Sequence, residues 1–410
     1  MLKKYGLFAG YTLILVLVVA LLSSGLTMLL SRSRSVAEEG SVTISRDEYD
    51  TLRRYLRLDQ FRGYIQHGYI EEIDDDTLMT GAMQGMFYSL NDPYSFYMTP
   101  EQTAAATQEE VGIYHGIGCQ LIVDPDDALI TVTRVYKDSP AMLAGIAPGD
   151  KIVRVFGEAV TGYELNEAVS KIKGEPGTST EITIRRGDEM IEMTIARAEV
   201  TVDRVEVRML EDGVGMITIY EFEGNVVASF KEALKSLEKE KAKGMIIDLR
   251  GNPGGSLDAV VSICDMLLPE CTIVTVEDRY GNVEEYTSDP SMTKMPLTVL
   301  INEMSASASE ILAGCVKDHK IGTLVGTQTF GKGIVQSVYV FKDDNSSIHL
   351  TTAKYFTPSG ENIHKIGIAP DRVVDLPEEL KINPTKLTDE NDTQLVAAIE
   401  EVKKLIGEME

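Results

Sequence analysis

The chain of 410 residues has no tryptophan, only four cysteines and five histidines, and few basic residues for its length. Its 39 lysines and arginines are outnumbered by 64 aspartates and glutamates, which gives a formal net charge of −25. Nucleic-acid binding needs positive surface against the phosphates, so a nucleic-acid partner is excluded. We interpret the acidity as a solvated surface. The length indicates two or three domains.

The scarce cysteines and histidines also limit the kinds of site. Neither a CxxC nor an HExxH pattern is present, so no metal site is predicted. Cys264 and Cys315 lie in apolar helical patterns and are expected to pack as small hydrophobic residues. A disulfide between Cys264 and Cys271 stays open as an alternative, and Cys119 has no predicted partner.

One uncharged segment stands out near the start of the chain. Gly6–Leu30 follows Lys3 and Lys4 and carries no charged residue. A run of about 20 apolar residues can cross a bilayer as a helix. No clear small-residue cleavage site follows, which favours an uncleaved transmembrane anchor over residues 1–31, with a cleaved signal peptide as the alternative. We therefore expect a single-pass protein of the cell membrane whose remaining chain is extracytoplasmic.

The rest of the chain divides by composition and periodicity into an α/β multidomain protein. A Ser-, Glu- and Gly-rich linker is predicted first, then a helical region, a small β-rich module, a core in which strands alternate with helices, and a helical tail. These parts are assigned to residues 32–45, 46–110, 111–198, 199–375 and 376–410. Helical segments at both ends make a homodimer plausible.

The β-rich module, 111–198, resembles a bacterial PDZ domain. The match is carried by SPAMLAGIAPGDKIVRV, residues 139–155, in which Ser139 and Pro140 predict a helix start. PDZ domains bind a peptide C-terminus by adding it as a strand to a sheet edge. The resemblance implies that the loop holding the peptide carboxylate comprises His115, Gly116, Ile117 and Gly118.

The core contains a serine and a lysine that together predict hydrolytic chemistry. Lys332 lies between two glycines in TFGKGIVQ, where desolvation would disfavour its ammonium form and lower its pKa. A neutral amine can take the proton of a serine hydroxyl, so Ser307, the middle serine of SASASE, is the candidate nucleophile. Ser305 and Ser309 are the rival serines, and helix capping is the alternative role for both.

These motifs, with others, resemble the C-terminal processing peptidases, also called tail-specific proteases. The family's order is reproduced by NDPYSFYM, VGMITIYEF, IIDLRGNPGG, SASASEILAG, TFGKGIVQ and TTAKYFTPSG, with Asn91 in place of an acid. The resemblance spans about residues 45–400. It implies Ser307 as nucleophile, Lys332 as general base and Gln336 as the residue that orients the lysine. It also implies an oxyanion hole at the backbone N–H groups of Gly254 and Ala308.

Two alternative sites are a phosphate-binding loop and a Ser-His-Asp triad. The run from Gly326 to Lys332 nearly spells a phosphate-binding loop, but Gly333 stands where Ser or Thr should hold magnesium, and a strand follows. A Ser-His-Asp triad would need a histidine. His67 and His115 lie outside the core, His319 lies at a charged helix end beside Asp318 and Lys320, and His349, on a predicted strand, stays open.

The sequence therefore predicts a serine endopeptidase that cleaves protein substrates presented by their C-termini, and it implies no metal or organic cofactor. Regulated proteolysis in signal transduction and general quality control are both compatible with this reading. The alternative is a PDZ scaffold at the membrane that does not cut.

Overall fold

The computed structural model describes residues 43–409. The predicted anchor, residues 1–31, lies outside the described residues, as does most of the linker. Among residues 43–409, no helix combines the length and apolarity needed to cross a membrane. The chain separates into two compact units, Met1–Ala82 and Met83–Glu410.

The described part of the first unit is helical. Helix α2 (Arg46–Gly68) begins at Ser45, whose hydroxyl accepts the Glu48 N–H while the Glu48 carboxylate accepts the Ser45 N–H. This reciprocal capping fixes the start of the helix. Helix α3 (Asp75–Tyr88) follows and crosses the boundary between the units. No residue of α2 is buried.

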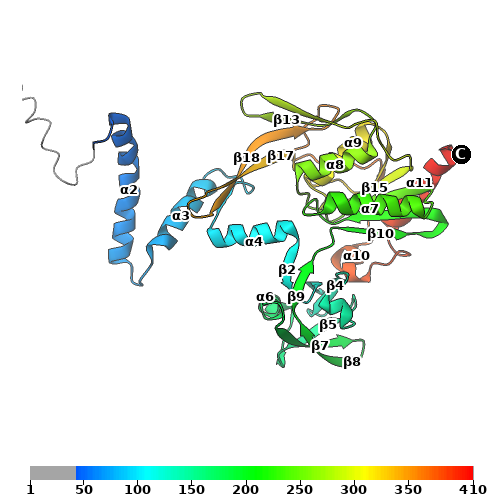
Figure 1. Cartoon of the computed structure of the whole chain (residues 1–410), viewed down its shortest axis with the longest axis horizontal. Helices are drawn as coiled ribbons and strands as arrows, with labels where there is room; N and C mark the ends of the chain where they lie inside the picture. Colours follow the sequence, from blue (N-terminus) through cyan, green and yellow to red (C-terminus); the bar gives the residue numbers. More distant parts are fainter. Residues whose placement is uncertain (1–42, 410) are drawn as a thin grey trace, which may run out of the picture. The chain divides into compact units, whose positions relative to one another are not determined.

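The second unit is built around a six-stranded sheet (Figure 1). The strand order is β10 (Val205–Met209), β11 (Val214–Ile219), β12 (Gly244–Asp248), β15 (Leu297–Ile301), β16 (Gly322–Gly326) and β19 (Arg372–Val373). All neighbours pair in parallel except β10 with β11. Strands β12 and β15 are buried at every position, as expected for parallel strands covered on both faces.

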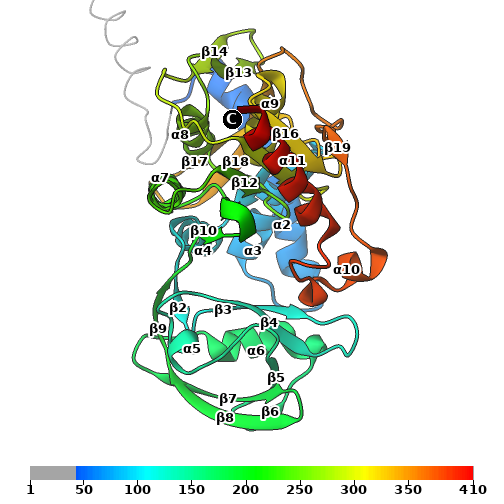
Figure 2. The ribbon, with the colours of Figure 1, turned by 90° about the vertical axis from the view of Figure 1, so that its right-hand side faces the viewer.

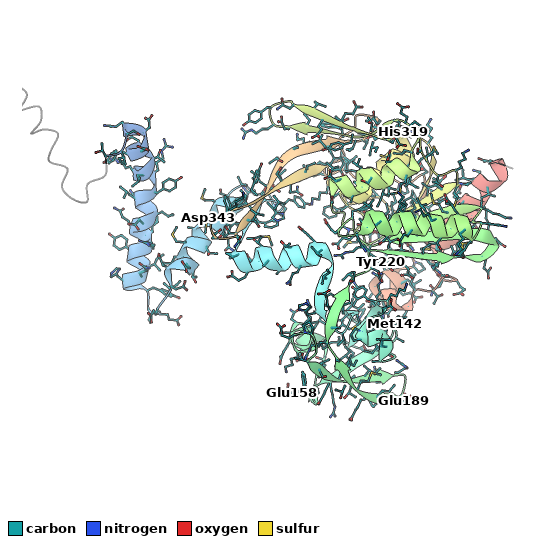
Figure 3. All side chains as sticks on the ribbon, viewed as in Figure 1. Met142, Glu158, Glu189, Tyr220, His319 and Asp343 are labelled. Carbon is teal, nitrogen blue, oxygen red and sulfur yellow. The ribbon has the colours of Figure 1, made fainter. Side chains whose placement is uncertain are left out.

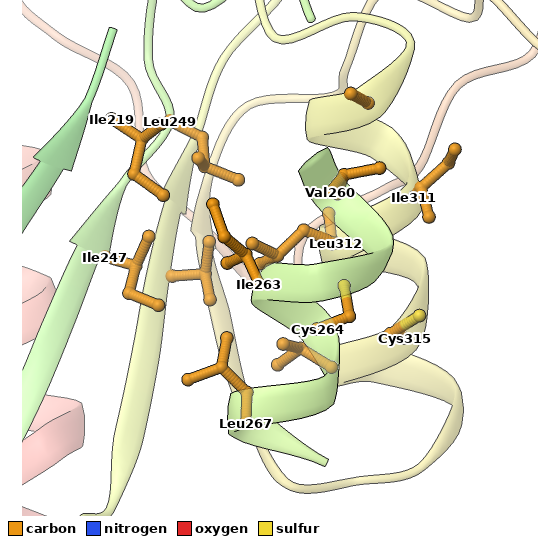
Figure 4. Packing of buried hydrophobic residues seen from close by; sticks show 14 of the residues in the cluster. Ile219, Ile247, Leu249, Val260, Ile263, Cys264, Leu267, Ile311, Leu312 and Cys315 are labelled. Carbon is orange, nitrogen blue, oxygen red and sulfur yellow. The ribbon is translucent and has the colours of Figure 1, made fainter. Parts of the chain in front are cut away.

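Helices cover the two faces of this sheet. On one face lie α7 (Val226–Lys239), α8 (Leu257–Leu267) and α9 (Ala308–Asp318), whose apolar side chains share one core with the sheet. Side chains of α8 and α9 lie beside Ile219, Ile247 and Leu249 of the sheet region (Figure 4). On the other face α11 (Thr393–Met409) packs Leu395, Ala398 and Val402 against alternate residues of the same strands, such as Met216 and Ile246. The predicted α/β core and apolar tail helix are thus confirmed.

A second, antiparallel sheet stands beside the first. It joins β1 (Phe96–Met98), β18 (Ser347–Phe356), β13 (Thr272–Asp278) and β14 (Val283–Thr287), and β17 (Ile334–Val340) pairs with β18. The predicted hairpin between 335 and 353 is therefore present. Strand β1, however, lies in a stretch predicted to be helical. Three residues are too few for a strand period to show in the sequence.

The PDZ-like module contains β3 (Cys119–Val123), β4 (Ile130–Val135), β5 (Lys151–Val155), β6 (Glu158–Ala159), β7 (Ser179–Arg186) and β8 (Glu189–Ala196), with helices α5 (Pro140–Leu143) and α6 (Leu165–Ile172) (Figure 2). Strand β3 pairs only with β4 and so forms a sheet edge. Strands β2 (Ile113–Gly116) and β9 (Ala198–Thr201) pair with each other where the chain enters and leaves the module. Helix α4 (Pro100–Val111) precedes β2, and α10 (Glu378–Ile382) follows the core.

All four cysteines are free thiols. Cys264 and Cys315, on the neighbouring helices α8 and α9, are buried in the apolar core, as predicted (Figure 4). The alternative of a disulfide between Cys264 and Cys271 is wrong.

Candidate active site

The candidate site lies at the carboxyl ends of parallel strands, where α/β sheets place their ligands. Strand β12 runs into the loop 249–256, and β15 runs into the loop 302–307 that opens helix α9. A third loop, 327–333, leaves β16 and leads into β17. The fold therefore brings the glycine-rich segment, the serine segment and the lysine segment to one edge of the sheet.

Ser307 occupies the position just before α9 in a strained conformation. Its φ is 53° and its ψ is −114°, a region that residues with a side chain rarely adopt. Such strain costs about 1–3 kcal/mol and gathers at functional sites. The Ser307 side chain is half-buried, and its backbone oxygen accepts a hydrogen bond from the Tyr355 hydroxyl at 3.1 Å.

The rival serines have structural partners. Ser305 and Ser309 are both fully buried. The Ser305 hydroxyl donates to the Leu249 oxygen at 2.8 Å, and the Ser309 hydroxyl donates to the Asn252 oxygen at 3.0 Å. Neither caps the helix, because Ser307 is the residue at the capping position. Both hydroxyls instead fasten the serine loop to the glycine-rich loop.

The glycine-rich loop approaches Ser307 so closely that Gly254 has no room for a side chain. A Cβ there would lie 2.7 Å from the Ser307 Cβ and 2.8 Å from the Ala306 oxygen, and the φ of Gly254 is 107°. The Gly254 N–H donates to the Asn252 Oδ1 at 2.9 Å. The Ala308 N–H, at the helix start, has no backbone or side-chain acceptor among the described residues. Helix N-termini of this kind stabilise developing anions.

Glu310 joins the serine loop to the lysine loop. It is fully buried in the first turn of α9. Its Oε2 accepts the N–H groups of Ser307 at 2.9 Å and Lys332 at 2.8 Å. Its Oε1 accepts the Gly331 N–H at 2.7 Å and the Thr329 hydroxyl at 2.6 Å. One carboxylate with four donors therefore fixes the backbone of both candidate catalytic residues.

Lys332 is half-buried, and its amine lies over an aromatic ring. The Nζ atom is 4.6 Å from the centroid of Tyr94. Burial lowers the pKa of Lys332, and the charges of Asp92 and Glu310 only partly oppose that effect. No hydrogen bond between described residues joins this amine to the Ser307 hydroxyl. The fold holds the two side chains in neighbouring loops without a direct bond.

Gln336 lies on β17, at the irregularity in the pairing of β17 with β18. Its Nε2 donates weakly to the Thr351 Oγ1, at 3.4 Å, rather than to Lys332. Gln336 thus lies on the strand that follows the lysine loop but is not bonded to the amine.

The histidines of the core have other contacts. His349, on β18, stacks on Phe96 with ring centroids 4.6 Å apart. His319, at the C-terminal end of α9 (Figure 3), lies 2.7 Å from the Thr272 oxygen through its Nε2. No hydrogen bond among the described residues links a histidine to Ser307. The geometry therefore gives no support to a Ser-His-Asp triad.

The geometry of residues 326–333 does not fit a phosphate-binding loop. The backbone N–H groups of Gly331 and Lys332, which a phosphate would need, are bound to Glu310. A strand, β17, follows in place of the helix that such a loop requires. Within residues 43–409, no cluster of His, Cys, Asp and Glu is arranged to hold a metal ion.

A separate cavity of about 550 Å³ lies where the PDZ-like module meets helix α4 and the segments 202–204 and 221–223. Gly116, Ile117 and Gly118 line it, together with Leu121 of the edge strand β3 and Ile172 of α6. His115 does not line this cavity but borders a neighbouring hollow, together with Tyr114 and Glu199. Its imidazole lies 4.0 Å from Glu199 on β9.

Three carboxylates, Glu110, Glu221 and Glu223, line the other wall of this cavity. Burial raises the pKa of Glu223 to about 7, and the nearby Glu110 and Glu221 add to the effect. Phe222 and Gly255 form an isolated parallel bridge, and the Phe222 N–H donates to the Gly254 oxygen at 2.8 Å. The segment that carries two of these carboxylates is therefore bonded to the loop that contacts Ser307.

Comparisons with known proteins agree with this geometry. Residues 213–374 match Peptidase family S41, residues 131–186 match a PDZ domain, and residues 21–102 match the Activating protease CtpB N-terminal domain. The Carboxy-terminal processing protease CtpA of Bacillus subtilis is 36% identical over 372 residues, which cover 90% of this chain and 78% of that protein. The chain belongs to this family of serine proteases.

A second relative gives the same assignment. The Carboxy-terminal processing protease CtpB of Bacillus subtilis is 37% identical over 330 residues, covering 79% of this chain and 68% of that protein. The solved structure of an S41 protease from Bacteroides fragilis has a TM-score of 0.56 at 18% identity, covering 85% of this chain and 97% of that one, and supports the fold. The predicted family and the predicted serine peptidase are confirmed.

Sequence reasoning missed several residues of this site. In the sequence, Glu310 is one residue of the motif SASASEILAG, and no local pattern predicts a role for Tyr94, Tyr355 or Asn252. A buried glutamate is unusual, so the Glu in the first turn of an otherwise apolar helix was the available signal. Tyr94 had no such signal, because its contact with Lys332 joins segments far apart in the sequence.

Proposed function

We propose that the protease is a membrane-tethered endopeptidase that works outside the cytoplasm, with Ser307 as nucleophile and Lys332 as general base. The observation that carries the proposal is the hold of Glu310 on both backbones, because it fixes the two loops in register. The burial that lowers the pKa of Lys332 favours the neutral amine that a base requires.

The reaction follows from these positions. The neutral amine of Lys332 takes the Ser307 proton while the serine Oγ bonds to the substrate carbonyl carbon. The lysine ammonium then gives that proton to the leaving nitrogen as the C–N bond breaks, which leaves an acyl-enzyme. A water molecule then attacks the acyl-enzyme while Lys332 takes its proton, and the ammonium returns that proton to the Ser307 oxygen as the carboxylic acid product leaves. Before the first step the amine must swing from the Tyr94 ring to Ser307, and the flexible lysine side chain allows this.

The charge that develops on the carbonyl oxygen needs donors. The open N–H of Ala308 serves one, aided by the helix start. The Gly254 N–H, in our proposal, exchanges Asn252 for the substrate oxygen. Gln336 takes the role of orienting the amine once Lys332 has moved, and its weak bond to Thr351 leaves it free to do so.

We further propose that the PDZ-like module binds the substrate's C-terminus. The unpaired edge of β3 can accept an added strand, and the cavity beside it has an apolar floor that includes Ile117, Leu121 and Ile172. In this proposal the backbone of 116–118 holds the terminal carboxylate. A substrate with a free, apolar C-terminal residue fits this groove.

Helix α2 supports a homodimer. Its apolar side chains, among them Tyr49, Leu52, Tyr55 and Phe61, are all exposed in the single chain. A helix that buries no residue on its own gains stability by packing against a partner. Sedimentation of the full chain should give twice the monomer mass. The substitution Leu52→Glu should reduce the measured mass to that of the monomer.

Location needs a test of its own. Full-length chain in spheroplasts should be digested by an added protease at sites within 43–409, and extraction should require detergent. Protection of those sites, or release by salt alone, would contradict a membrane-tethered extracytoplasmic enzyme.

Activity is tested on the full-length chain with an unstructured reporter protein. Ser307→Ala and Lys332→Ala should each lower cleavage by about 10²–10⁴-fold without loss of fold. The exposed Ser291→Ala and Lys235→Ala are matched controls that should cut at the normal rate. Amidation of the reporter's C-terminus should reduce cleavage if the PDZ groove reads the carboxylate. Normal cutting by Lys332→Ala would reject the mechanism.

A further inference from the structure

Tyr94 lies in direct contact with the amine of Lys332, although it belongs to none of the loops at the carboxyl edge of the sheet. The Nζ atom stands over the ring face, 4.6 Å from the centroid. The ring is half-buried. An aromatic face attracts an ammonium ion through its quadrupole and gives a neutral amine no comparable attraction.

Hydrogen bonds hold the segment that carries the Tyr94 ring. The Tyr94 N–H donates to the Asp92 Oδ1 at 3.0 Å, and the Ser95 hydroxyl donates to the Asp92 Oδ2 at 2.6 Å. The Thr351 N–H in turn donates to the Ser95 Oγ at 2.9 Å. The next residues form β1, which pairs with β18, so the tyrosine is held against the hairpin that Lys332 leads into.

The charged groups around the amine do not replace the ring. Asp92, from the tyrosine's own segment, and Glu310, from α9, both favour the ammonium form of Lys332. Their carboxylates, however, already accept two and four hydrogen bonds from neighbouring groups. Two histidines also lie near this site: burial lowers the pKa of His349 on β18, with Lys332 contributing in the same direction, and burial lowers the pKa of His364, which lies against Gly333.

The phenol itself stays neutral in the working range. Burial raises the pKa of Tyr94, and the charges of Asp92 and Glu310 raise it further. The ring therefore acts on the amine as a neutral π surface.

We propose that Tyr94 is a positioning residue for the general base: its ring face holds the protonated Lys332 amine between turnovers and releases the neutral amine toward Ser307. The proposal rests on the role of Lys332 as base. It assigns to Tyr94 control over the pH at which the enzyme becomes active, because a group that binds only the ammonium form raises the pKa of that amine.

The test is a series of full-length variants at position 94, beginning with Tyr94→Phe and continuing through fluorinated phenylalanines. Fluorine withdraws electron density from the ring and weakens its attraction for a cation while nearly preserving its shape. The pH dependence of kcat/KM reports the free enzyme's base. Tyr94→Phe should keep the acid limb of the wild type, and each added fluorine should move it to lower pH. Tyr94→Leu should move it by about half a pH unit or more.

The failures can be told apart. If the acid limb stays fixed across the fluorinated series while Ser307→Ala and Lys332→Ala are inactive, the Tyr94 proposal is overturned and the mechanism stands. If Lys332→Ala remains active, the mechanism itself is wrong. A merely structural tyrosine would lower the activity of Tyr94→Leu at all pH values without moving the limb, and the fluorinated variants, which keep the ring, would then show no trend.

Discussion

Glu310 binds the backbone of Lys332 and not its amine. The Oε2 atom accepts the Lys332 N–H at 2.8 Å, while the Nζ atom of the same lysine lies over Tyr94. The carboxylate therefore acts as an anchor for the loop and leaves the side chain free to move. This separation would let one rigid loop present the mobile base that we propose.

Replacing Glu310 should damage both stability and activity. Glu310→Ala would leave four donors without an acceptor, two of them in buried hydrogen bonds, at about 1–3 kcal/mol for each that water cannot reach. We expect a lower free energy of unfolding in urea and loss of Ser307 reactivity. Glu232→Gln, on the exposed side of α7, is the control and should change neither. Wild-type stability for Glu310→Ala would contradict its role as anchor.

Gly254→Ala should inactivate the enzyme, because its Cβ would collide with Ser307. Gly251 offers a matched control in the same loop. It also has a positive φ, 73°, but no atom lies within 4 Å of an added Cβ. Gly251→Ala should show only the conformational cost of about 1–2 kcal/mol. Equal losses of activity in the two variants, measured at equal folded fraction, would show that contact with Ser307 is not the cause.

Lys332→Met should abolish turnover and yet stabilise the fold at neutral pH. The folded state lowers the pKa of Lys332 from its ordinary value of 10.5, so the ammonium form opposes folding. Wild-type stability should rise as pH increases from the lowered pKa toward 10.5. The Tm advantage of the methionine variant should thus be largest near pH 7 and shrink toward pH 10. A Tm difference that stays constant from pH 7 to pH 10, or that Lys235→Met also shows, would contradict the prediction.

Glu223 should make stability fall as pH rises. Its folded pKa is about 7, above its ordinary 4.5, so its contribution is complete below 4.5 and is lost as pH passes through 7. Glu223→Gln resembles the protonated form. Its Tm should equal that of the wild type near pH 4.5 and exceed it at pH 8. Glu238→Gln, exposed on α7, serves as the reference, and an equal gain at both pH values would refute the assignment.

The sequence was sufficient where regular periodicity or a motif carried the information. The buried strands β11, β12 and β15 and the apolar face of α11 follow from their patterns. Ser307 and Lys332 came from the motifs, and the structure places them in adjoining loops that Glu310 connects.

The rest depended on contacts that no local pattern contains. Helix capping was the alternative role for Ser305 and Ser309, but their hydroxyls donate to the backbone oxygens of Leu249 and Asn252. Strand β1 exists only because β18 offers it an edge, and that pairing brings Tyr94 to Lys332. Such long-range partners decide the details of the site, and they appear only once the chain has folded.

The central claim is most directly tested by labelling the full-length enzyme with a fluorophosphonate and locating the adduct by mass spectrometry. The account predicts one labelled serine, Ser307, with labelling that rises with pH and is lost in Lys332→Ala. An adduct on Ser305 or Ser309, or full labelling of Ser307 without Lys332, would contradict it.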